Sequence, residues 1–126
     1  MQDERTIVVG HSSGAVAAMR LAEQQKVLGI VLISACHTDL GLKSERIAGY
    51  YSRPWLWDAI KANAGWILQY HSDNDPFIPA EEARHVAKSL GSDYFELVGK
   101  SHYFSFASIT PIMGELTKKL KAELRK

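Results

Sequence analysis

Short apolar runs alternate with helix-like stretches along most of this chain. Four runs have the length and composition of buried strands: residues 6–9, 29–33, 66–70 and 94–98. Apolar side chains at helical spacing predict helices at residues 13–23, 81–90 and 108–125. Strands that alternate with helices form parallel sheets, and right-handed crossovers place helices on both faces. The order of elements therefore predicts an α/β fold, with a mostly parallel sheet flanked by helices, in a single domain over residues 1–126.

The charge balance limits the class of partner. The 126 residues include 15 Lys and Arg against 14 Asp and Glu, which gives a net charge of +1. This balance offers no basic surface to nucleic acid, and the basic residues from Lys118 onward alternate with leucines, as on the solvated face of a last helix. No apolar run is long enough to cross a membrane, and Cys36, the single cysteine, cannot form an internal disulfide. We therefore expect a cytoplasmic protein with no nucleic-acid or membrane partner.

Residues 10–14 read GHSSG and match the pattern G-x-S-x-G. In this pattern the serine sits on a sharp turn between a strand and a helix, so that its hydroxyl projects above the sheet. The flanking glycines leave room for the turn, and the helix N-terminus offers N–H groups to an oxyanion. Since a predicted strand precedes the segment and a predicted helix follows it, Ser12 is the predicted nucleophile. His11 and Ser13, in the same turn, are expected to bind substrate; a purely structural glycine-rich turn is the alternative.

A histidine suited to act as the base of Ser12 follows the last predicted strand. His102 stands in a loop from which it can reach a serine at the carboxyl ends of the strands, and the chain order Ser, Asp, His supports a catalytic role. Of the other histidines, His37 follows a strand and could line the site, whereas His85 falls on a helix and is expected to face solvent. The full set of competitors is His11, His37, His71 and His85.

The acid that orients the histidine is expected in the loop after the third predicted strand. Asp73 and Asp75 both stand there, and the prolines that follow Asp75 fix it in an extended turn. We favour Asp75 as the acid over Asp73, the second candidate, and Asp39, the third. The aspartates that are not the acid are expected to form turns or cap helices.

No metal site and no cofactor are predicted. The chain has no paired cysteines, no histidines spaced for a metal, and no lysine-serine pair after a glycine-rich loop. Cys36 ends a predicted buried strand, so we interpret it as a residue at the edge of the core and not as a nucleophile.

Residues 37–63 are less regular and rich in aromatic side chains. A short helix is predicted near residues 44–51, and Pro54 suits the first turn of another that runs to Ile60. This segment could cover the site as a lid, and Trp57 is accordingly a candidate substrate-binding residue. The favoured interpretation is that Trp55 and Trp57 pack on the sheet, because aromatic side chains mostly supply core area.

Three stretches resemble the retinoblastoma-binding protein nine family of serine hydrolases: residues 6–20, residues 51–57 (YSRPWLW) and residues 75–79 (DPFIP). The resemblance runs from Arg5 to about Phe104. It implies an α/β-hydrolase fold, no cofactor, and esterase- or aminopeptidase-like hydrolysis of small substrates. It also implies that Ser12, Asp75 and His102 are the nucleophile, acid and base.

The resemblance also implies segments that would lie ahead of Arg5. The family has further strands there, a glycine-rich loop that completes the oxyanion hole, and a motif associated with binding the retinoblastoma protein. We therefore expect a partial α/β-hydrolase fold with N-terminal strands missing, and a retinoblastoma-type partner by resemblance only. Hydrolysis of small ester or amide substrates is the first hypothesis, and a non-catalytic binding or regulatory module is the second.

Overall fold

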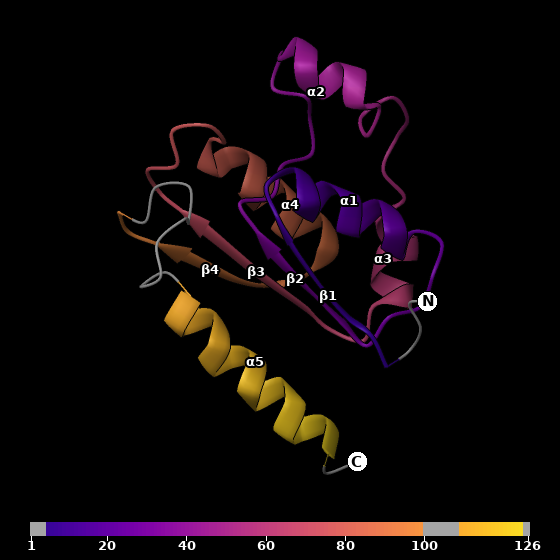
Figure 1. The fold of residues 1–126 in the computed structure, drawn as a ribbon, viewed down its shortest axis with the longest axis vertical. Coiled ribbons are helices and arrows are strands. Elements are labelled where there is room, and N and C mark those ends of the chain that lie inside the picture. The colour runs from indigo at the N-terminus through magenta and orange to yellow at the C-terminus, as the bar shows by residue number, and fades with distance from the viewer. Residues whose placement is uncertain (1–4, 100–108, 125–126) are drawn as a thin grey trace.

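The computed structural model describes residues 5–99 and 109–124, which form one four-stranded parallel sheet with helices against it (Figure 1). The strands, hydrogen-bonded in this order, are β1 (Ile7–His11), β2 (Gly29–Ile33), β3 (Ile67–Ser72) and β4 (Asp93–Leu97). The register places Val9 opposite Val31. Because all four strands run in one direction, their carboxyl ends lie at the same edge of the sheet, where open α/β sheets bind ligands.

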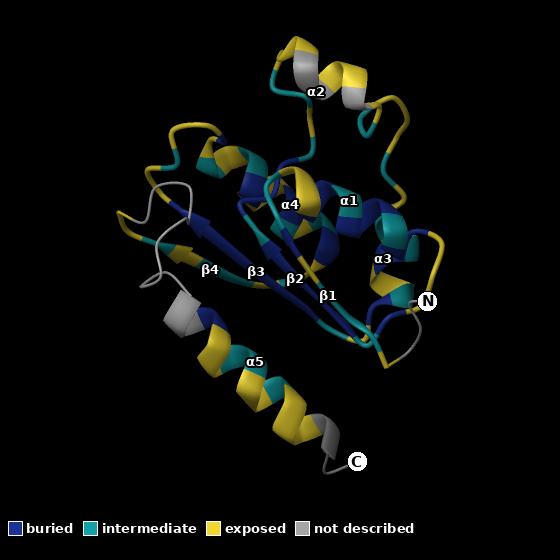
Figure 2. Ribbon diagram, in the orientation of Figure 1, coloured by how far each residue is buried: buried dark blue, intermediate teal, exposed yellow. Residues whose placement is uncertain are grey.

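The two inner strands carry the apolar centre of the sheet. Every residue of β3 is buried, as are the first four of β2, whereas β1 and β4 are mostly half-buried or exposed (Figure 2). This difference follows from position, since a strand between two neighbours and two layers of helices has no solvated side. The observed strands lie within two residues of the predicted bounds.

Helices cover both faces of the sheet, as the alternation of elements predicts. On one face lie α1 (Ser13–Ala22), α3 (Trp57–Asn63) and α4 (Ala80–Leu90), and α5 (Ile109–Leu124) crosses the other (Figure 1). Ile112 and Leu116 of α5 pack against a cluster that includes Leu68 and Tyr70 of β3. Within the part of the chain that the structure describes, no helix is both long and apolar enough to cross a membrane.

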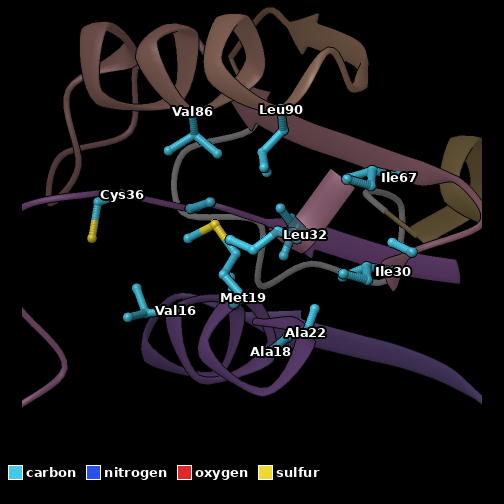
Figure 3. Packing of buried hydrophobic residues seen from close by; sticks show 14 of the residues in the cluster. Val16, Ala18, Met19, Ala22, Ile30, Leu32, Cys36, Ile67, Val86 and Leu90 are labelled. Carbon is cyan, nitrogen blue, oxygen red and sulfur yellow. The ribbon is translucent and has the colours of Figure 1, made fainter. Parts of the chain in front are cut away.

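The larger core cluster joins α1, β2 and α4. In the view of Figure 3, Met19 of α1 lies below Leu32 of β2 and Val86 of α4 lies above it, and all three belong to the cluster on one face of the sheet. Three buried alanines, Ala15, Ala18 and Ala22, let the backbone of α1 come close to the strands. This packing fixes α1, and the predicted nucleophile, Ser12, is the residue that directly precedes this helix.

The segment between β2 and α3 differs from its prediction. It holds one short helix, α2 (Lys43–Ala48), which stands away from the sheet (Figure 1), and α3 begins at Trp57 and not at Pro54. The cause lies in α1: Arg20 donates hydrogen bonds to the carbonyl oxygens of Arg53 and Pro54 at 2.7 and 3.0 Å. Glu23 accepts one from the N–H of Leu56 at 2.9 Å. These buried side chains hold residues 53–56 in a non-helical path.

Candidate active site

Ser12 occupies a strained turn between β1 and α1. Its φ of 58° and ψ of −117° lie where L-residues are rarely found, at a cost of about 1–3 kcal/mol. Its N–H donates to the carbonyl oxygen of Ile33 at the end of β2 (2.8 Å), and its own carbonyl accepts from Ala15 in the first turn of α1 (3.0 Å). The neighbouring strand and the helix therefore hold Ser12 at the carboxyl edge of the sheet.

The two glycines of the pattern have different roles. A Cβ on Gly10 would collide with the backbone of Gly14 and Ala15, so the close approach of β1 to α1 requires glycine at position 10. A Cβ on Gly14 would meet no atom within 4 Å. Both glycines are expected to leave room for the tight turn and for the close approach of neighbouring elements, and the structure supplies a steric reason of this kind at Gly10 alone.

Asp75 lies in the loop after β3, with its carboxylate fully buried. Its Oδ1 accepts hydrogen bonds from the N–H groups of Phe77 and Ile78 at 2.8 and 2.9 Å, which fixes the orientation of the carboxylate. The competing Asp73 is exposed and accepts from the N–H of Gly99 at 3.1 Å, as an aspartate that stabilises a loop does.

Asp39, the third candidate acid, lies in a surface turn. Its carboxylate accepts hydrogen bonds from the N–H of Gly41 and from Arg46, and these two partners hold the pKa of Asp39 below its usual value. Both partners are local, which is the arrangement of a turn-forming aspartate.

The predicted base, His102, lies outside the described residues, but another histidine stands beside the predicted acid. His71 of β3 is fully buried, and its Nε2 lies 2.9 Å from the carbonyl oxygen of Ile78 and 3.8 Å from Oδ2 of Asp75. A carbonyl only accepts, so Nε2 carries the proton and donates to Ile78. Among the described residues Nδ1 has no hydrogen-bond partner. His71 thus ties the Asp75 turn back to its strand.

Sequence reasoning named His71 only as one of several competing histidines. A polar residue inside an apolar strand, four residues before the favoured carboxylate, was the available signal. Two of the other three competitors, His37 and His85, stack on each other with their ring centroids 4.0 Å apart. Nε2 of His37 lies 3.2 Å from Oε2 of Glu82, and His85 is exposed. Burial and the neighbouring His85 lower the pKa of His37, although Glu82 opposes that shift.

A small pocket opens beside Ser12. Its volume is about 60 Å³, and the described residues that line it are Ser12, Ser13, Cys36, Leu40, Leu42, Tyr51, Phe77 and Ile78. These come from the turn before α1, the loop after β2, the flanks of α2 and the loop after β3. No metal-binding cluster of three or more His, Cys, Asp or Glu occurs in the ranges 5–99 and 109–124.

The predicted substrate-binding residues do not all meet at this pocket. Ser13 lines it, and His11 is half-buried at the end of β1, outside the lining. Trp57 lies elsewhere: its ring stacks on Trp55 at 5.3 Å between centroids and packs against the core. Both tryptophans border a separate hollow above α3. Their position agrees with packing as their main role.

Comparison with known proteins decides the family. The family model described as serine hydrolase matches residues 1–109. The chain belongs to the serine hydrolase family. Within that family it is 48% identical over 101 residues to the rat serine hydrolase RBBP9, which covers 80% of this chain and 54% of the rat protein. The chain thus spans about half the length of that relative.

Solved structures place this serine hydrolase family chain in the α/β-hydrolase fold. The ydeN gene product of B. subtilis superposes with a TM-score of 0.82 at 20% identity, covering 95% of this chain and 68% of that one. Alpha/beta hydrolase domain-containing protein 10 from mouse gives 0.65 at 17% identity, covering 97% and 64%. A carboxylesterase of the archaeon Nitrososphaera gargenis gives 0.73 at 14% identity, covering 94% and 67%. These likenesses confirm the predicted fold class.

Proposed function

We propose that the chain carries the catalytic serine of a hydrolase for small esters or amides, with Ser12 as nucleophile, Asp75 as acid and His102 as base. One observation carries the proposal. Ser12 is held at positive φ between β1 and α1, and it borders a pocket at the carboxyl edge of the sheet. Strain of this kind persists only where the surrounding structure enforces it, and it concentrates at functional sites.

The proposed reaction is acyl transfer in two steps. The hydroxyl proton of Ser12 passes to the base, Oγ bonds to the carbonyl carbon, and the bond to the leaving alcohol or amine breaks as that group takes the proton. Water then attacks the acyl-serine by the same route and releases the acid. The N–H of Ser13 opens α1 directly after the nucleophile, and we assign it to the oxyanion that forms in each step.

The role proposed for Asp75 rests on its burial and fixed orientation. A buried carboxylate that holds the imidazole selects the correct tautomer and stabilises the imidazolium when the proton arrives. Asp75 has this environment, whereas Asp73 is exposed to solvent. We further propose a small-molecule substrate and a cytoplasmic location. A retinoblastoma-type partner stays a proposal that rests on the sequence resemblance alone.

A second candidate function is a non-catalytic binding module that retains the site residues. The observation that favours it concerns β1, which carries the serine turn. In the described part of the chain β1 pairs only with β2, and Val9 is 58% exposed. A site built on a half-supported edge strand could bind a ligand without the rigidity that catalysis needs.

Ester hydrolysis by matched serine variants tests the proposal. Ser12→Ala should reduce the hydrolysis of p-nitrophenyl acetate to background, because loss of a triad member commonly costs several orders of magnitude in kcat. Ser13→Ala keeps its backbone N–H and should change the rate only mildly. A rate for Ser12→Ala within about tenfold of the unaltered chain would remove Ser12 from the mechanism.

A further inference from the structure

The pocket beside Ser12 is too small for a large substrate group. Its 60 Å³ compares with about 10–15 Å³ for one water-sized position, so it has room for about four to six such positions. Leu40, Leu42, Phe77 and Ile78 make most of its wall apolar. No charged side chain lines it among the residues that the structure describes.

Tyr51 and Cys36 join two parts of the wall. The Sγ of Cys36, in the loop after β2, lies 3.1 Å from the hydroxyl of Tyr51, which follows α2. Both residues line the pocket, and Cys36 is only 4% exposed. Their contact closes the wall between two segments that lie 15 residues apart in the chain.

Arg20 and Glu23 hold the segment that carries Tyr51 in place. Arg20 of α1 donates to the carbonyl oxygen of Tyr50 at 2.9 Å, and its guanidinium lies 3.7 Å from the centre of the Trp55 ring. Glu23, which is fully buried, pairs with Arg20 and Arg53 at 2.8 Å each. Because charged hydrogen bonds from Arg20 and Glu23 hold this part of the wall, we expect it to move little when a bulky substrate binds.

We propose that this pocket takes the acyl part of the substrate, and that Tyr51, in contact with Cys36, limits it to short apolar acyl groups of about two to five carbons. This inference rests on the proposed function of Ser12. The acyl group is the part that remains bonded to Oγ of Ser12 in the covalent intermediate, so it must lie in the space that this serine borders. Charged acyl groups are disfavoured because the apolar wall would leave them unpaired.

A series of p-nitrophenyl esters tests the length limit, because the leaving group stays constant while the acyl chain grows. The butyrate should react at least about tenfold faster than the octanoate, since even one misfit methylene can change selectivity by that factor. Tyr51→Ala should move the preferred chain length upward by two or more carbons. Tyr50→Ala is the matched control: Tyr50 packs on the core outside the pocket lining, so this variant should keep the original profile. If Tyr51→Ala fails to fold, Tyr51→Leu replaces it in the same ester series, and the preferred chain length should move in the same direction.

Phosphonylation gives a readout that does not need turnover. In an alkylphosphonofluoridate the serine oxygen bonds to phosphorus, fluoride leaves, and the hydroxyl proton passes to the base, while the alkyl chain stands in for the acyl chain. Mass spectrometry should show butyl probes labelling Ser12 faster than octyl probes on the unaltered chain, and the difference should shrink in Tyr51→Ala.

The outcomes separate the two proposals. Equal labelling by short and long chains, or an unchanged preference in Tyr51→Ala, would overturn the acyl limit and leave Ser12 as nucleophile. A series of butyrate esters in which only the alcohol grows gives the converse test. If Tyr51→Ala shifted the preferred length of the alcohol, the pocket would hold the leaving group, and the acyl limit would also be overturned. No labelling of Ser12 by any probe would remove both proposals.

Discussion

Ser12 owes its position to contacts that its own side chain does not make. Backbone hydrogen bonds to Ile33 and from Ala15 hold it at positive φ, and the missing Cβ of Gly10 lets β1 pass close to α1. At the scale of single residues, the geometry of the site therefore depends on its neighbours as much as on the serine.

Gly10→Ala and Gly14→Ala should have opposite effects on stability. The new Cβ at position 10 meets backbone atoms that cannot move independently, so we expect Gly10→Ala to lower the free energy of unfolding by about 1–3 kcal/mol and to displace Ser12. At position 14 the space is open and the residue is helical, so Gly14→Ala should be neutral or stabilising by up to about 1 kcal/mol. Urea unfolding of both variants measures this; equal losses would contradict the steric account.

The two loop aspartates should differ sharply in their effect on rate. Asp75→Asn keeps the shape of the side chain but favours the wrong histidine tautomer, so kcat should fall by roughly a thousandfold or more. Asp73→Asn changes an exposed side chain and should cost far less. Steady-state ester hydrolysis by both variants gives the ranking, and a reversed ranking would transfer the role of the acid to Asp73.

At the scale of elements, α1 positions both the candidate nucleophile and the segment before α3. Ser12 caps the N-terminus of α1, and Arg20 in its last turn and Glu23 at its C-terminal cap hold residues 53–56. Burial alone would raise the pKa of Glu23, but the N–H of Leu56 and the guanidinium groups of Arg53 and Arg20 outweigh it, so the pKa lies below its usual value. The ionised carboxylate therefore stabilises the fold.

Glu23→Gln should lower stability in a pH-dependent way. Because the folded-state pKa is below the unfolded value, the contribution is complete above about pH 4.5 and is lost as the pH falls through the folded-state pKa. At pH 7 the variant leaves two arginines without their buried partner, and we expect a loss of about 3 kcal/mol. Thermal unfolding should show the difference between variant and parent shrinking in acid. Glu81→Gln, at an exposed position, is the control; equal effects of the two changes would contradict the anchoring role.

The order of the elements could be predicted from the sequence, but the path of residues 53–56 could not. Apolar periodicity located the four strands of the sheet because burial on both faces leaves a local pattern. Pro54 also carried a local signal for a helix start, yet Arg20 and Glu23, more than 30 residues away, outcompete it with direct hydrogen bonds. The pocket likewise depends on the Cys36–Tyr51 contact, which no local pattern indicates.

At the scale of the whole molecule, the two edges of the sheet differ. β4 carries Asp93 and Glu96, and Glu96 pairs with Arg84. These charged side chains protect that edge against pairing with a strand of another chain. β1 has no Asp, Glu, Lys or Arg, and its Val9 is 58% exposed. An apolar edge strand of this kind favours pairing with another chain.

We therefore expect residues 1–126 alone to self-associate, and Val9→Lys to raise the monomeric fraction severalfold. A lysine on β1 places a charge where a second strand would pair. Val98→Lys is the matched control, because Val98 is 81% exposed but follows β4. Size-exclusion chromatography over a range of concentrations measures the fraction. A monomeric parent, or equal improvement by both substitutions, would show that the β1 edge does not drive association.

The central claim is that the strained serine of the β1–α1 turn is the nucleophile. Peptide mapping after reaction with a fluorophosphonate probe tests it directly, because only an activated serine reacts and the modified residue is identified by mass. We predict a single adduct on Ser12, lost in Ser12→Ala and retained in Ser13→Ala. An unmodified chain, or an adduct on Ser13 with Ser12 intact, would contradict the account.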